Sequence, residues 1–343
     1  MADLRAELFR FIESPDPDRF DALALQVAQA QAREIPAYGR WVEHRGGLEH
    51  WRQAPWVPTE AFRSFDLCTT PPRPQDVIFE TSGTTTGTPG RRRVPDLSLY
   101  DGAMAGPFLD ALLGGDETRR PWISLIPTSD VLPTSSLSHM VSGLAARYSD
   151  LERSSCHLDA TGLDASGAIE ALREVDEPAL VLTTSFALIN LLDAWSGPNA
   201  RLPKGSTLML TGGFKGRSRT LDVSSLESLI EERLGLPASA IVGEYGMTEW
   251  TSQAYGLGVR PALVAPPWLK IRVIDPITLR DQDPGTPGLV ASFDLLNLDN
   301  VSAVLTSDIG VLDAQGGLSL VGRAPSAHPR GCGLTALDWG TRP

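Results

Sequence analysis

The strongest constraint on the fold is an alternation between short apolar runs and longer stretches with helical spacing. The runs, which we interpret as strands, are separated by stretches of about 10–15 residues that favour helices. The expected strands are residues 77–79, 122–126, 179–182, 207–210 and 240–242, and the expected helices are residues 97–113, 135–146, 185–195 and 222–234. This pattern predicts an α/β fold: a doubly wound, mostly parallel sheet with helices on both faces. Such sheets bind ligands at the carboxyl ends of their strands.

Composition and charge exclude several classes of protein. The 343 residues carry a net charge of −12, so the surplus of Lys and Arg that nucleic-acid binders use is missing. No apolar run approaches the roughly 18 residues of a membrane span, and the first residues lack the layout of a signal peptide. Cys68, Cys156 and Cys332 lie far apart, which fits neither a disulfide framework nor a zinc site. We therefore expect a cytoplasmic protein without a nucleic-acid partner or a membrane span.

A loop rich in glycine and hydroxyl side chains follows the run at residues 77–79. It reads TSGTTTGTPG over residues 81–90 and is followed by Arg91, Arg92 and Arg93. Glycines let a ligand approach the backbone, and successive N–H groups can point at an anion. The loop lacks the spacing of the Walker P-loop, and a flexible linker or a solvated charge run are the alternatives. Its place after a strand and before a helix favours a loop that binds polyphosphate.

Four short motifs occur in order between residues 80 and 323. They are the loop at residues 82–89, Glu244-Tyr245-Gly246-Met247-Thr248-Glu249, Thr306-Ser307-Asp308 and Gly322-Arg323. In this order they resemble the hallmarks of the adenylate-forming enzymes, the superfamily of acyl-CoA synthetases and firefly luciferase. The resemblance implies a reaction in which a carboxylate attacks the α-phosphate of ATP, releases pyrophosphate and leaves an acyl-adenylate.

Three further segments narrow the resemblance. They read TGGFKGR over residues 211–217, EWTSQ over residues 249–253 and RGC over residues 330–332. These segments are similar to the acyl-protein synthetases, the LuxE-type subunits of the bacterial fatty-acid reductase that supplies aldehyde for bioluminescence. This resemblance implies a fatty acid as substrate. It also implies transfer of the acyl group to a cysteine thiol, which gives a thioester that an acyl reductase or acyl-carrier partner protein takes up.

The resemblance to the superfamily also implies roles for the residues that match its motifs. Because one anion attacks another, catalysis depends on charge neutralisation and positioning. Glu249 is expected to bind Mg²⁺ and Tyr245 to stack on adenine, although both could simply cap a turn. Asp308 is expected to accept the ribose hydroxyls, and Arg323 to fix the ribose and the α-phosphate. The other residues expected to bind ATP are Ser82, Gly83, Thr84, Thr85, Thr86, Gly87, Gly212, Gly213, Phe214, Gly246 and Thr248.

The chain has only three lysines, Lys204, Lys215 and Lys270. In the wider superfamily a catalytic lysine lies on a mobile C-terminal domain of roughly a hundred residues. Here 20 residues follow Arg323, so we expect that domain to be absent. Lys215, in a loop after an expected strand, is then the candidate catalytic residue that supplies the missing charge. A solvated loop lysine is the alternative.

Two further residues are candidates for catalysis. His139 lies where a loop enters an expected helix and resembles the histidine near the acyl carboxylate in the superfamily, with a structural histidine as the alternative. Cys332 lies between two glycines and close to Arg330, and a nearby cation lowers the pKa of a thiol. The resemblance implies that Cys332 carries the acyl group, whereas an inert thiol is the alternative. We expect Cys68 and Cys156 to be buried or partly buried and to take no part.

These expectations divide the chain into three regions. Residues 1–74 form an N-terminal helical region packed on the core, residues 75–255 an α/β nucleotide-binding core, and residues 256–343 a small β-rich subdomain that completes the site. The leading hypothesis is an ATP-dependent acyl-protein synthetase. One alternative is a ligase that passes the acyl group to an amine, a carrier protein or coenzyme A. The other is an inactive nucleotide-binding scaffold of a reductase complex.

Overall fold

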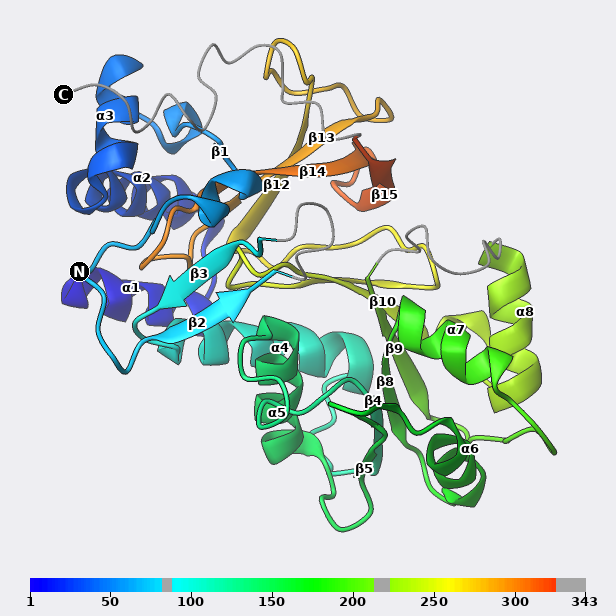
Figure 1. Ribbon diagram of the computed structural model, residues 1–343. Coiled ribbons are helices and arrows are strands. Elements are labelled where there is room, and N and C mark those ends of the chain that lie inside the picture. The colour runs from blue at the N-terminus through cyan, green and yellow to red at the C-terminus, as the bar shows by residue number, and fades with distance from the viewer. Residues whose placement is uncertain (82–87, 213–222, 325–343) are drawn as a thin grey trace. The chain divides into compact units, whose positions relative to one another are not determined.

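The computed structural model describes residues 1–81, 88–212 and 223–324, which divide into two compact units (Figure 1). Unit 1 comprises Met1–Ala103, Met247–Ser252 and the chain from Ala265 onward. Unit 2 comprises Met104–Gly246 and Gln253–Val264. The division into three regions stays a prediction. No described helix is long and apolar enough to cross a membrane.

Unit 2 is built on a six-stranded sheet with the order β11-β10-β9-β8-β4-β5. Neighbouring strands are parallel except for β10 and β11, which are antiparallel. The strands are β4 (Trp122–Leu125), β5 (Ser155–Cys156), β8 (Leu180–Thr184), β9 (Thr207–Thr211), β10 (Ile241–Tyr245) and β11 (Ala254–Leu257). The mostly parallel sheet that the alternation predicts is therefore confirmed.

Helices cover both faces of this sheet. Helix α5 (Ser136–Tyr148) lies on the opposite side from α6 (Ala165–Glu174), α7 (Ser185–Asp193) and α8 (Val223–Leu234) (Figure 1). The last three helices and one face of the strands share a single apolar core, which leaves the strands buried. Strands buried on both faces read as continuous apolar runs, which is why the pattern was visible in the sequence. A small hairpin, β6 (Leu158–Asp159) and β7 (Gly162–Leu163), and α4 (Ser98–Leu113), which begins in unit 1, complete the unit.

Unit 1 contains a second, mainly antiparallel sheet with the order β1-β14-β13-β12, and β15 pairs with β14. Its strands are β1 (Val57–Pro58), β12 (Leu269–Ile274), β13 (Gly288–Asp294), β14 (Ala303–Leu312) and β15 (Leu318–Arg323). Its helices are α1 (Ala2–Glu13), α2 (Pro17–Glu34) and α3 (Pro36–His44), with the short 3₁₀ helices η1 (Trp51–Gln53) and η2 (Thr59–Arg63). The small C-terminal β subdomain is therefore confirmed.

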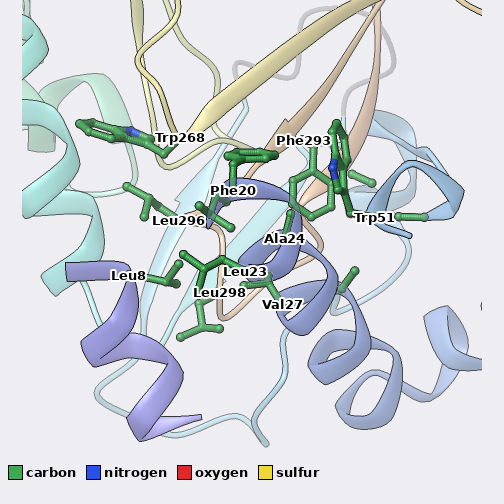
Figure 2. Close-up of a cluster of buried hydrophobic side chains, with 14 of the residues drawn as sticks. Leu8, Phe20, Leu23, Ala24, Val27, Trp51, Trp268, Phe293, Leu296 and Leu298 are labelled. Carbon is green, nitrogen blue, oxygen red and sulfur yellow. The ribbon is translucent and has the colours of Figure 1, made fainter. Parts of the chain in front are cut away.

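The N-terminal helices bury their apolar sides in the core of unit 1 (Figure 2). Phe20 of α2 meets Trp51, with ring centroids 5.5 Å apart, and Trp51 meets Phe293 of β13 at 5.0 Å. Leu8 of α1 and Leu298 belong to the same cluster. Residues from both ends of the chain thus share one core, which fixes the strands that carry the third and fourth motifs.

Strands β2 (Val77–Glu80) and β3 (Arg91–Val94) form a separate antiparallel pair in unit 1. Within the described part of the chain β2 does not join the parallel sheet, so its inclusion in that alternation was wrong. The alternative of a solvated charge run was also wrong for Arg92 and Arg93, whereas the side chain of Arg91 is 65% exposed. Arg92 and Arg93 are 3% and 7% exposed, because each guanidinium has polar partners inside unit 1. β2 and β3 are therefore the two strands of one hairpin, and residues 82–87 lie between them in the sequence.

Candidate active site

Glu249 lies on a segment of unit 1, residues 247–252, of which residues 249–252 are buried. Its side chain is 4% exposed, and burial raises the pKa of its carboxyl to about 7. The positive charges of Arg92 and Arg323 act to lower this pKa, and the negative charge of Glu60 acts to raise it. Glu249 therefore lies within electrostatic reach of Arg323, which the fourth motif contributes.

The buried carboxylate of Asp294 holds the end of this segment. It accepts hydrogen bonds from the backbone N–H groups of Thr251 (2.8 Å), Ser252 (3.0 Å) and Leu296 (3.1 Å). The hydroxyl of Ser252 donates at 2.9 Å to Oδ1, the oxygen that also accepts from Leu296, whereas the amides of Thr251 and Ser252 donate to Oδ2. Burial raises the pKa of Asp294, while these hydrogen bonds and the charge of Arg92 oppose the rise. Asp294 thus fixes the backbone immediately after Glu249.

The third and fourth motifs meet on neighbouring strands. Asp308 of β14 and Arg323 of β15 are paired in register, and Arg323 Nε donates to Asp308 Oδ1 at 2.7 Å. Ser307 donates its hydroxyl to Glu60 Oε1 at 3.0 Å. Unit 1 therefore brings Thr248, Glu249, Asp308 and Arg323 together in one body. Glu60, Asp294 and Asn297 were missed by sequence reasoning, although an Asp and an Asn in the apolar stretch at residues 289–298 were a usable signal.

The second motif is shared between the units, because Tyr245 and Gly246 belong to unit 2. Tyr245 is a buried residue at the end of β10. Gly212 follows β9 with φ of 78°, a backbone conformation that favours glycine. The hydroxyl of Ser185, at the start of α7, donates to the carbonyl of Gly212 at 2.6 Å. The carboxyl ends of β8, β9 and β10 thus carry two of the predicted nucleotide residues at the edge where parallel sheets bind ligands.

Glu244 is a buried carboxyl at the same edge of unit 2. Its side chain accepts a hydrogen bond from the hydroxyl of Thr211, the residue paired with it on β9. Its other oxygen lies against Gly246, where a Cβ atom would come within 2.6 Å of it. Burial raises the pKa of Glu244 to about 7, and the bond from Thr211 opposes this only partly. A glycine at position 246 therefore leaves room for the carboxyl of Glu244.

Glu244→Gln is expected to change the pH dependence of stability. Between pH 4.5 and 7 the folded protein keeps a proton on Glu244 that the unfolded chain releases, so the parent loses stability as pH rises. Gln does not titrate and can still accept from Thr211. The free energy of unfolding of the variant should therefore rise relative to the parent by about 3 kcal/mol across this window. Urea denaturation at several pH values checks this, and a difference independent of pH would contradict it.

The structure places the remaining candidates as follows. His139 is half-buried in the first turns of α5. Cys68 is buried as expected, whereas Cys156 is exposed, which corrects the expectation for that residue. The residues that lie outside the described parts of the chain are Ser82, Gly83, Thr84, Thr85, Thr86, Gly87, Gly213, Phe214, Lys215 and Cys332. Their roles, like those of all the site residues, stay predictions.

The fold is that of the adenylate-forming ligases. ATP-bound MatB from Rhodopseudomonas palustris matches with a TM-score of 0.51 and 16% identity over 72% of this chain and 47% of MatB. An open conformation of 2-hydroxyisobutyryl-CoA ligase, in complex with 2-HIB-AMP and CoA, matches with a TM-score of 0.60 and 16% identity over 87% of this chain and 73% of that one. A long-chain-fatty-acid-CoA ligase from Archaeoglobus fulgidus matches with a TM-score of 0.52 and 16% identity over 72% of this chain and 51% of that ligase. This chain spans about half the length of MatB.

The comparison with protein-family models points to one family within this fold. Residues 193–338 match the family model described as acyl-protein synthetase, LuxE. No curated protein matches the chain in sequence. The resemblance to the LuxE-type proteins, which the sequence motifs indicated, is therefore confirmed over residues 193–338. The solved structures confirm the fold that the resemblance to the adenylate-forming superfamily implied.

Proposed function

We propose that this protein is an ATP-dependent ligase that activates a carboxylic acid as an acyl-adenylate. The observation that carries the proposal is the arrangement in unit 1. Glu249 is buried within electrostatic reach of Arg323, and Arg323 pairs in register with Asp308. The three side chains to which we assign a metal, a ribose and a phosphate thus belong to one compact unit. The match to the LuxE family model over residues 193–338 covers all three residues.

The residues of unit 1 fit a magnesium ion that is held jointly by protein and nucleotide. Mg²⁺ is usually bound by one or two carboxylates together with substrate phosphates. Among the described residues no group of three metal-ligating side chains occurs, so a site built from protein ligands alone finds no support there. Glu249 offers one buried carboxylate whose charged form is costly without a cation. Bound Mg²⁺ would neutralise part of the charge on the phosphates.

The other residues would bind and orient the reactants. Asp308 can accept hydrogen bonds from two ribose hydroxyls, while Arg323, which donates to it, is a cation suited to the α-phosphate. In unit 2 we assign Tyr245 and Gly212 to the adenine, because an aromatic ring and an open glycine backbone suit a flat base. These groups lower the barrier by holding two anions in place and offsetting their charge.

We further propose that the acid is a fatty acid and that Cys332 receives the acyl group. Support for both comes from the match to the LuxE family model, which includes position 332. The thiolate would attack the carbonyl carbon of the acyl-adenylate. A C–S bond then forms, the C–O bond to AMP breaks, AMP leaves, and the thiol proton passes to solvent. Transfer to an amine, a carrier protein or coenzyme A is the alternative outcome of the test.

The test has two stages. ATP–pyrophosphate exchange is measured across a panel of carboxylic acids, and the protein is then analysed by intact mass for an attached acyl group. Cys332→Ser is expected to abolish the acylated species while leaving exchange intact. Cys156→Ser is the matched control, because Cys156 is an exposed thiol that should retain both signals. If none of the acids in the panel supports exchange, the ligase assignment is overturned. If the Cys332→Ser protein is still acylated, the assignment of the cysteine is overturned.

A further inference from the structure

We propose that Arg92 is a positioning residue that fixes the backbone around Glu249 relative to β2 and β3, the strands on either side of the loop at residues 82–87 in the sequence. The inference rests on the proposed function, since it assumes that Glu249 serves a metal. Arg92 belongs to β3, the strand that follows this loop. It was grouped in the sequence with a cluster of cations for phosphate, but its guanidinium is buried in unit 1 and is bonded to protein groups.

One nitrogen of the guanidinium, Nη1, is hydrogen-bonded to the backbone on both sides of Glu249. Arg92 Nη1 donates to the carbonyl oxygen of Trp250 and, at 3.3 Å, to that of Thr248. These two carbonyls belong to the residues immediately before and after Glu249. One nitrogen therefore restrains the peptide units that set the direction of the Glu249 side chain.

The other terminal nitrogen, Nη2, is linked to the backbone of Glu249 by way of the Asn297 side chain. Arg92 Nη2 donates to Asn297 Oδ1 at 2.6 Å and to the hydroxyl of Thr251 at 2.6 Å. Asn297 Nδ2 in turn donates to the carbonyl of Glu249 itself at 2.8 Å and to that of Val301 at 3.0 Å. The carbonyls of three consecutive residues, 248–250, are thus all satisfied by Arg92 and Asn297.

The segment at residues 247–252 is also hydrogen-bonded to β2, the other strand of the hairpin. The hydroxyl of Thr248 donates to the carbonyl of Glu80, the last residue of β2, at 3.4 Å. The segment therefore contacts β2 through Thr248 and β3 through Arg92. Because β2 and β3 pair in register, with Glu80 opposite Arg91, both strands of this hairpin are bonded to the segment that carries Glu249.

An arginine is required by this geometry. Its planar fork donates in two fixed directions at once, whereas a lysine is a single point of charge on a flexible stem. Arg92→Lys keeps the positive charge near Asp294 but cannot hold the carbonyls and Asn297 together. Residues that orient a metal ligand typically change metal affinity by about 10–100-fold when they are replaced. If Arg92 positions Glu249, its replacement by lysine should therefore weaken metal binding and not only lower the stability of the fold.

The experiment measures Mn²⁺ binding in place of Mg²⁺, by electron paramagnetic resonance, in the presence of α,β-methylene-ATP. This analogue cannot be cleaved at the bond that adenylation breaks, so the readout is independent of turnover. Arg92→Lys is expected to raise the Kd for Mn²⁺ by about 10-fold or more while the Kd for the metal-free analogue in EDTA stays unchanged. Arg93→Lys is the matched control, because Arg93 is a neighbouring buried arginine whose side chain binds Asp66 and Asp76.

The outcomes separate the inference from the proposed function. If the parent protein does not bind the metal–nucleotide complex, the proposed function fails and the inference fails with it. If the parent binds and folded Arg92→Lys binds Mn²⁺ with an unchanged Kd, only the inference is overturned. Should Arg92→Lys not fold, Thr251→Val, which removes one acceptor of Nη2, replaces it. For Thr251→Val, a Kd for Mn²⁺ raised about threefold or more supports the inference, and an unchanged Kd for Mn²⁺ overturns it.

Discussion

Glu249→Gln is expected to lower the rate of ATP–pyrophosphate exchange by about 10²–10³-fold. Gln has nearly the same shape and can still accept a hydrogen bond, but it removes the buried negative charge that we assign to Mg²⁺. The loss should persist at saturating ATP and be relieved only partly by raising Mg²⁺, because the defect lies in binding and placing the metal. The measurement is exchange rate against Mg²⁺ concentration for parent and variant.

Glu244→Gln is the matched control for this change. Both carboxyls are buried, and burial raises the pKa of each to about 7. Both variants should therefore gain stability at neutral pH relative to the parent, whereas only Glu249→Gln should lose exchange. A Glu249→Gln protein that is stabilised and still exchanges at the parental rate would show that the carboxylate does not serve the metal.

The parallel sheet was predictable because its strands are buried on both faces and so appear as apolar runs. The run at residues 77–79 has the same appearance, yet β2 pairs with β3, which lies across the loop at residues 82–87. Periodicity reports that a strand is buried and does not report its partner. A hairpin around a glycine-rich loop and a strand that leads to a helix therefore look alike in the sequence.

The candidate site was predictable where a motif carried it and unpredictable where distant residues support it. Asp308 and Arg323 were expected from the motifs, and their pairing in register follows from two antiparallel strands. Arg92 and Asn297 lie 205 positions apart, yet their side chains are hydrogen-bonded. A buried polar contact of this kind leaves only a weak trace in the sequence, namely an amide inside an apolar stretch.

Asp294→Ala is expected to lower the free energy of unfolding by about 3–5 kcal/mol. The substitution leaves the amides of Thr251, Ser252 and Leu296 without their acceptor. It also removes the negative charge that stabilises the protonated form of the buried Arg92. A buried cation that loses its counter-charge is far more costly than a surface ion pair that is broken. The measurement is urea denaturation at neutral pH.

Asp281→Ala is the control, because Asp281 pairs with Arg272 at a more exposed position of the same unit. Its loss should cost less than about 1 kcal/mol. Asp294→Asn should fall between the two, since it keeps an acceptor oxygen but turns two N–H donors toward amides that also donate. If Asp294→Ala were no less stable than Asp281→Ala, the segment at residues 247–252 would be held by its apolar neighbours. The polar network would then contribute orientation without contributing stability.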